Sequence, residues 1–160
     1  MIPETAKIIN EIRPLVTREA IVREARSCLG TPWLHQGRVP GLKGGLDCAG
    51  LIIYVAHTLE LSTFDYTAYS RYPDGRQLRA LLDAHLDRIA RADLREADVL
   101  LMTEARWPCH VALVSETRPR ERIIHSVAKY RKVVEHALDA AWAVKIRGAY
   151  RFRGVSDERS

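Results

Sequence analysis

The chain has 160 residues, of which 47% are hydrophobic and 28% are charged. This length and composition are typical of one soluble domain with its own core, and they argue against a disordered chain. No apolar stretch approaches the roughly 20 residues that a membrane helix needs, so we expect no membrane insertion. The formal net charge is +5, but there is no dense basic run, so we expect no nucleic-acid partner.

The three cysteines, Cys28, Cys48 and Cys109, are odd in number and show no CxxC spacing. This pattern argues against a disulfide framework and against a ribbon-type zinc site. A single reactive thiol among buried ones fits the pattern better. We therefore expect neither a metal ion nor a cofactor.

The domain organisation follows from the ends of the chain. Residues 1–16 are expected to form an N-terminal arm, residues 17–154 a single domain, and residues 155–160 a C-terminal tail. The start lacks the basic-then-apolar layout of a secretory signal, and no lipid-anchor motif is visible. We therefore expect synthesis in the cytoplasm, with a carrier delivering the protein to any external substrate.

The first predicted helix begins after Thr17, a residue suited to capping, and ends before Gly30. Cys28 falls on the apolar face of this helix, which predicts a core position. Residues 31–46 hold two prolines and four glycines and are expected to form a long loop without structure of its own. Such loops in compact domains are usually functional.

The rest of the chain changes from helical to β-rich character. An apolar run predicts a buried helix that begins at Asp47-Cys48-Ala49-Gly50, and Asp74 with Gln77 resembles a cap for a second, amphipathic helix. Five β-rich segments and one helical piece at 139–144 follow, the segments being 98–102, 109–114, 122–127, 132–138 and 146–153. The order predicts an α+β fold, with N-terminal helices packed on an antiparallel sheet of about five to six strands.

Cys48 is the candidate nucleophile. It stands after a Gly-rich loop and opens a buried helix, where the helix N-terminus favours a thiolate. Its backbone N–H has no intrahelical partner there and is free to hold a developing oxyanion. The alternative is a small buried hydrophobic residue, which is what most free cysteines are.

His110 and His125 are the candidate base and the residue that orients it. His110 opens an apolar segment typical of a central strand, where a histidine is either a core residue or a site residue. His125 lies in the next such strand, and antiparallel neighbours would bring the two imidazoles together on one face. That pair is what an activated nucleophile requires.

The remaining histidines give weaker signals. His57 is nine residues after Cys48, which places it on the opposite side of that helix. His85 is expected to be solvated, and His136 lies in a strand flanked by charged residues with nothing to recruit it. His35 differs, because its loop must lie near Cys48.

These motifs together resemble the NlpC-type cell-wall cysteine peptidases, over roughly residues 19–153. The loop pair His35-Gln36 and the segment 148–152 are typical of the branch found in phage tails and gene transfer agents. The residues that carry the resemblance are Gly30-Thr31-Pro32-Trp33, Gly37, Asp47-Cys48-Ala49-Gly50-Leu51, Ala97-Asp98-Val99-Leu100, His110-Val111-Ala112-Leu113 and Ile124-His125-Ser126.

The resemblance implies a minimal papain-like domain that hydrolyses peptidoglycan stem peptides, typically between D-glutamate and a diamino acid. The family's cysteine, histidine and third polar residue fall on Cys48, His110 and His125. The resemblance also implies possible phage-like tail-tip partners, a virion location and action at the cell wall, with local wall penetration during DNA delivery.

Trp33, His35 and Asp47 are the expected substrate-binding residues. Two of the neighbouring positions depart from the family pattern. Many members have a tyrosine where Trp33 stands, and many have a serine where Ala49 stands; that serine acts with the aspartate to recognise a free stem amine. An intact cell-wall stem is therefore a reasonable substrate for this chain.

Three other interpretations remain open. A structural tail component with a vestigial hydrolase fold is the first, although Cys48, His110 and His125 are all chemically intact. An amidase or acyltransferase with the same Cys-His triad is the second. A metal site built from Cys48, Cys109 and His110 is the third, but neighbouring residues of a strand point to opposite faces, which separates Cys109 from His110.

Overall fold

The computed structural model describes residues 14–104 and 106–157, so most of the expected arm lies outside the described residues. In these described residues, three helices precede the main sheet: α2 (Arg18–Ser27), α3 (Cys48–Thr58) and α4 (Arg76–His85). A six-stranded antiparallel sheet follows, with the strand order β3-β8-β4-β5-β6-β7. Its strands are β3 (Asp87–Ile89), β4 (Val99–Glu104), β5 (Trp107–Glu116), β6 (Arg122–Val127), β7 (Lys132–Ala137) and β8 (Ile146–Arg151). The predicted α+β class is confirmed.

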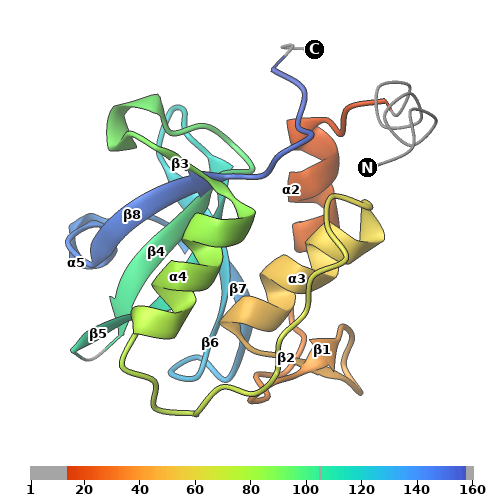
Figure 1. Cartoon of the computed structure of the whole chain (residues 1–160), viewed down its shortest axis with the longest axis vertical. Helices are drawn as coiled ribbons and strands as arrows, with labels where there is room; N and C mark the ends of the chain where they lie inside the picture. The colour runs from red at the N-terminus through yellow and green to blue at the C-terminus, as the bar shows by residue number, and fades with distance from the viewer. Residues whose placement is uncertain (1–13, 105, 158–160) are drawn as a thin grey trace, which may run out of the picture.

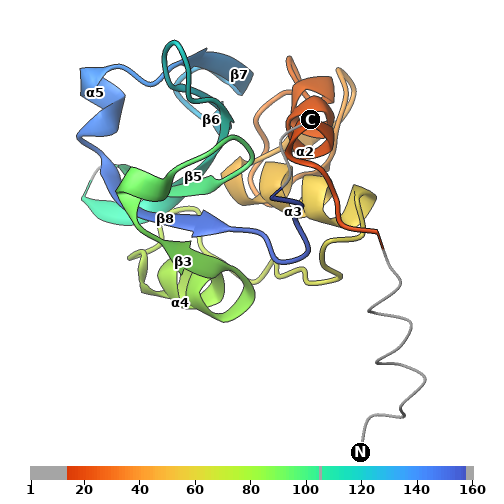
Figure 2. The same ribbon diagram turned by 90° about the horizontal axis from the view of Figure 1, so that it is seen from above.

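Helices α2, α3 and α4 pack on the same face of the sheet. Figures 1 and 2 show α2 beside α3, with the N-terminal end of α3 directed at the sheet, while α4 lies next to β3. The first helix is as predicted: the Thr17 side chain accepts a hydrogen bond from the Ala20 N–H at 3.1 Å, and Gly30 follows the helix with φ 84°. The predicted piece at 139–144 is also present as α5 (Ala140–Ala143), capped by Asp139.

The loop expected at 31–46 does have structure of its own, contrary to the prediction. It contains a small hairpin of β1 (Arg38–Val39) and β2 (Gly45–Leu46). The hairpin packs on α3 so closely that a Cβ at Gly50 would lie 2.0 Å from the Gly37 carbonyl oxygen. Glycine at position 50 is therefore required by the approach of two backbones.

The predicted cap of α4 is wrong. Gly75, with φ 83°, is the residue that precedes the helix, and no side chain caps it. Asp74 accepts instead from the Arg76 N–H at 3.0 Å, and Gln77 donates to the Tyr66 hydroxyl at 2.9 Å. The left-handed turn at Gly75 sets Asp74 one residue too far back to act as a helix cap.

Both faces of the sheet are buried. The face toward the helices packs on Leu51 and Val55 of α3, while the other face packs on Trp142 of α5. Alternate residues of β5 divide between these two cores, with Val111 in the first and Ala112 in the second. This arrangement confirms β5 as a central strand without a solvent-exposed face, and it desolvates any polar side chain that the strand carries.

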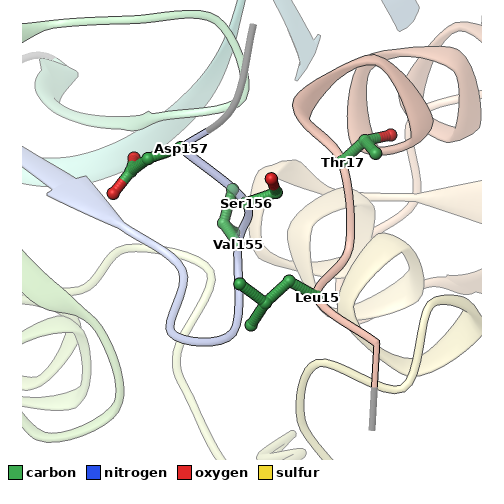
Figure 3. Close-up of a pocket in the computed structure, with 5 residues that line it drawn as sticks. All are labelled: Leu15, Thr17, Val155, Ser156 and Asp157. Atoms are coloured by element: carbon green, nitrogen blue, oxygen red, sulfur yellow. The ribbon is translucent and has the colours of Figure 1, made fainter. Parts of the chain in front are cut away.

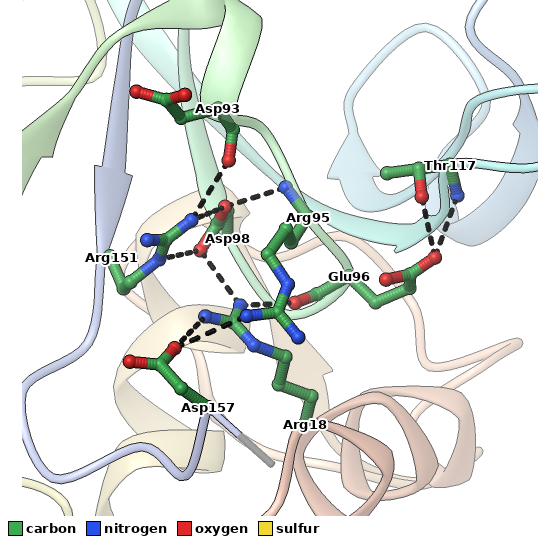
Figure 4. A network of polar contacts seen from close by, with 8 residues as sticks. All are labelled: Arg18, Asp93, Arg95, Glu96, Asp98, Thr117, Arg151 and Asp157. Carbon is green, nitrogen blue, oxygen red and sulfur yellow. Dashed lines mark hydrogen bonds and ion pairs between the residues drawn. The ribbon is translucent and has the colours of Figure 1, made fainter. Parts of the chain in front are cut away.

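A buried ion-pair network joins the first helix to the sheet (Figure 4). Asp98 is fully buried and accepts hydrogen bonds from Arg18 at 3.2 Å and from Arg151 at 2.9 Å through both carboxylate oxygens. The backbone N–H of Arg95 donates to the same carboxylate at 2.8 Å. Asp98 thereby connects α2, β4 and β8 at a single point.

We expect Asp98→Ala to lower the free energy of unfolding by about 3–5 kcal/mol, because it leaves the buried Arg18 guanidinium with only the exposed carboxylate of Asp157 as a counter-ion. Urea unfolding measures this change. The matched control is Asp87→Ala, which removes the exposed pair between Asp87 and Arg153 and should cost less than about 1 kcal/mol. Equal losses in the two variants would contradict this account of Asp98.

Candidate active site

Asp47 fixes the start of the helix on which Cys48 stands. Its side chain caps α3 by accepting a hydrogen bond from the Gly50 N–H at 2.7 Å, and Cys48 is the first residue of the helix. The backbone N–H groups of this first turn have no intrahelical carbonyl partners of their own. The sequence therefore predicted the placement of Cys48 correctly.

The Asp47 carboxylate also gathers the surrounding loops. One of its oxygens accepts from the Gln36 N–H at 2.7 Å and from the Tyr69 hydroxyl at 2.5 Å. The other accepts from Arg38 at 3.4 Å in addition to its helix contact. Asp47 is buried, so its hydrogen-bonding capacity is taken up within the protein. The contact with Tyr69 was not foreseen, because residues 59–75 carry no periodic pattern. The contact with Arg38 was missed because residues 31–46 were expected to have no structure of their own.

Cys48 also approaches the strand that carries His110. Its thiol receives hydrogen bonds from the backbone N–H groups of Val111 and Ala49, so it lies next to the peptide that follows His110. A second contact lies close by: the Ser126 hydroxyl of β6 donates to the carbonyl of Leu46, just before α3, at 2.6 Å. The start of α3 and the residues just before it are thus attached to both β5 and β6.

The thiol is held in its neutral form. Burial, and next the negative charge of Asp47, raise the pKa of Cys48 to about 12, and the hydrogen bonds from Val111 and Ala49 only partly oppose this. The expected dominance of the helix N-terminus is therefore not found, because desolvation disfavours the anion more strongly. A thiolate at this position would therefore require a base that takes the proton of Cys48.

Three histidines form a hydrogen-bonded row. His110 and His125 meet as predicted, with 2.7 Å between His110 Nε2 and His125 Nδ1. His136, which was expected to have no role, lies 2.7 Å from His125 Nε2 through its own Nε2. The prediction failed because it ignored the register: His125 pairs with Val134, so His136 lies two residues further along the same face. The register of β6 and β7 was therefore the signal that would have placed His136 beside His125.

The row is enclosed by Trp142. The indole contacts the ring of His125 edge-on, with the ring centres 4.8 Å apart, and lies 5.3 Å from that of His136. The Lys145 ammonium stands over the same indole at 4.3 Å. Burial, reinforced by the charge of Lys145, lowers the pKa of His110 to about 4, and burial likewise lowers the pKa of His125. Both rings are neutral at physiological pH.

The expected substrate-binding residues lie on one side of Asp47. The ring of His35 contacts Tyr69 edge-on at 5.5 Å, and Tyr69 in turn binds Asp47. Trp33 is half-buried, and the guanidinium of Arg71 lies 5.0 Å from the centre of its indole ring. The structure therefore brings Trp33 and His35 into the loops around Asp47.

Other polar groups surround the histidine row without joining it. Glu104, at the end of β4, places a carboxylate oxygen 3.9 Å from His110 Nδ1, which is beyond hydrogen-bonding distance. Cys109 donates to the Glu104 carbonyl at 3.6 Å. His57 and His85 are exposed, as their positions in the sequence predicted.

A separate surface pocket shares no residue with this cluster. It lies where the two ends of the described chain meet, beside the Val16–Val155 bridge, and is lined by Leu15, Thr17, Val155, Ser156 and Asp157 (Figure 3). Among the described residues, no helix is long and apolar enough to cross a membrane.

The fold is that of NlpC/P60 proteins. An NlpC/P60 family protein from Bacillus cereus superposes with a TM-score of 0.63 and 19% identity, over 87% of this chain and 41% of that protein. A protein described as similar to lipoprotein, of the NLP/P60 family, from Staphylococcus aureus gives 0.61 and 20%, over 88% and 42%. This chain thus spans about two fifths of the length of these two proteins.

A single NlpC/P60 domain is matched over its whole length. The NlpC/p60 domain of the peptidoglycan hydrolase SagA superposes with a TM-score of 0.57 and 22% identity, over 86% of this chain and 100% of that domain. By sequence, the chain matches no protein-family model and no curated protein. The likeness therefore establishes the fold, including the helix and strands that carry the candidate site.

The buried histidines should make the fold sensitive to acid. The folded-state pKa of His110 is about 4, below its ordinary value of 6.5, so the unfolded chain binds a proton in this window that the folded chain does not. Stability is therefore complete above about pH 6.5 and falls as the pH drops. For His110 alone we expect a loss of about 2 kcal/mol between pH 7 and pH 5.

Urea unfolding at the two pH values gives the measurement. His110→Gln should show a smaller loss than the wild type, while His57→Gln, which changes an exposed histidine, should follow the wild type. Equal acid sensitivity in all three proteins would contradict the assignment of a lowered pKa to His110.

Proposed function

We propose that this protein is a cysteine endopeptidase that hydrolyses peptidoglycan stem peptides, with Cys48 as nucleophile, His110 as base and His125 as the residue that orients the base. The observation that carries the proposal is the 2.7 Å contact between His110 and His125, beside the strand position that binds the Cys48 thiol. The NlpC/P60 fold supports it, since SagA, which contains one of the similar domains, is a peptidoglycan hydrolase.

The chemistry follows from the neutral resting state of the thiol and the imidazole. His110 Nδ1 takes the proton of Cys48 as the sulfur attacks the carbonyl carbon of the peptide, and the carbonyl oxygen becomes an oxyanion. The backbone N–H of Cys48, at the start of α3, stabilises this oxyanion. The protonated His110 then gives its proton to the leaving amine, and water hydrolyses the acyl-enzyme with His110 again acting as base.

We assign the D-glutamyl–diamino acid bond as the bond that is cleaved, within an intact stem. The saturated hydrogen bonding of the Asp47 carboxylate supports the second part, because that carboxylate has four donors within the protein and little capacity for a free stem amine. Trp33 and His35, beside Asp47, remain the proposed contacts to the peptide.

Digestion of purified diaminopimelate-type peptidoglycan, followed by mass analysis of the fragments, tests the reaction and the bond. We expect Cys48→Ala to reduce cleavage to background, because no other residue is placed to form the acyl-enzyme. Cys109→Ala is the matched control and should retain most of the activity, since its thiol binds only a backbone carbonyl. Cleavage by Cys48→Ala at the wild-type rate, or no cleavage by the wild type, would overturn the proposal.

The same activity suits a protein that rides in a phage-like tail tip and opens the wall locally during DNA delivery. The sequence features typical of tail-associated relatives, His35-Gln36 and residues 148–152, support this part of the proposal. We expect mass spectrometry of purified particles to find the protein. Its presence only as free enzyme in the cytosol would favour a role in lysis or wall recycling instead.

A further inference from the structure

The proton positions along the histidine row follow from one backbone carbonyl. His136 Nδ1 lies 2.8 Å from the carbonyl oxygen of Ala137. A carbonyl oxygen can only accept a hydrogen bond, so His136 Nδ1 must carry the proton. In a neutral imidazole the other nitrogen is then an acceptor, and in His136 that nitrogen is the Nε2 that faces His125.

The same reasoning passes along the row one ring at a time. At 2.7 Å, two ring nitrogens share one hydrogen bond, in which one nitrogen donates and the other accepts. Because His136 Nε2 is the acceptor, His125 Nε2 must be the donor. Neutral His125 then accepts through Nδ1, so His110 Nε2 carries the proton of the next contact. His110 is left with Nδ1 as its unprotonated nitrogen.

We propose that His136, anchored by the Ala137 carbonyl, is a positioning residue that fixes the tautomers of His125 and His110, so that His110 Nδ1 is free to take the thiol proton. This inference rests on the proposed role of His110 as the base. The opposite polarity of the row would place the proton on His110 Nδ1, where it would block transfer from Cys48.

The residues around the three histidines favour this arrangement of protons. The register of β6 and β7 puts His125 and His136 on the same face, and Trp142 packs against both rings. Water is therefore a poor competitor for the nitrogen atoms that face one another. The Glu104 carboxylate lies 3.9 Å from His110 Nδ1, which is too far to accept a hydrogen bond from an N–H there. It therefore does not stabilise the tautomer of His110 that is protonated on Nδ1.

Nitrogen-15 NMR of the wild-type protein with labelled histidine tests this arrangement of protons directly, without substrate. Protonated and unprotonated ring nitrogens have resolved chemical shifts, so each tautomer can be read at neutral pH. We expect protons on Nε2 of His110, on Nε2 of His125 and on Nδ1 of His136. A proton on His110 Nδ1 would overturn the inference, and this measurement needs no variant that might fail to fold.

Two variants test the consequence for turnover. His136→Gln keeps an acceptor for the His125 N–H and should retain kcat within about threefold, whereas His136→Lys offers only donors and should lower kcat about 10–100-fold, which is within the usual contribution of a general base. KM should change little in either variant. His57→Gln serves as the control for replacing a histidine far from the row.

The outcomes separate this inference from the proposed function. If the wild type cleaves peptidoglycan and His136→Lys matches it in kcat, His136 has no positioning role. If the wild type does not cleave peptidoglycan, the NMR assignment still supports or refutes the tautomer row. Rescue by His136→Gln but not by His136→Lys is the pattern that a merely structural role would not produce.

Discussion

The buried carboxylate of Asp47 is the constraint on which the geometry of the site depends. It caps the start of α3 and, through Gln36 and Tyr69, holds two loops against the same point. Three segments that are far apart in sequence thus share one acceptor, and each would leave a buried donor unpaired without it. The position of Cys48 is a consequence of this arrangement. The cost is electrostatic, because a carboxylate next to the thiol disfavours its ionisation.

That cost sets the kind of chemistry that the site supports. A preformed thiolate–imidazolium pair needs an environment that stabilises both charges, but burial shifts the pKa of Cys48 upward and that of His110 downward. Both groups rest in neutral form, so in the proposed reaction transfer of the proton accompanies attack on the substrate. In such a mechanism the tautomer of the base matters as much as its position, since a base protonated on the wrong nitrogen cannot accept.

Much of this arrangement was predictable from the sequence. Cys48 was marked by its place after a Gly-rich loop at the start of a buried helix, and His110 and His125 by their places in apolar β-rich segments. The pairing of these two successive segments predicted the contact between the histidines. His136 was missed because its place depends on the hairpin register, which is set by the turn at residues 128–131 and not by local pattern. The hairpin of β1 and β2 was missed for another reason: its strands have two residues each and depend on packing against α3.

The two-sided burial of the sheet explains why the site uses neutral imidazole rings at His110 and His125. β5 and β6 have apolar neighbours on both faces, so a carboxylate beside His125 would pay a large desolvation penalty, whereas a neutral imidazole can be satisfied by one N–H···N contact on each side. Such a row fixes direction but supplies no countercharge when His110 gains its proton. Lys145 opposes that charge, and Glu104 lies 3.9 Å from the nitrogen that receives the proton. Burial and Lys145 therefore disfavour a proton on His110, and the Glu104 carboxylate offsets this only in part; this balance suits the proposed role of His110, which passes the proton on to the leaving amine.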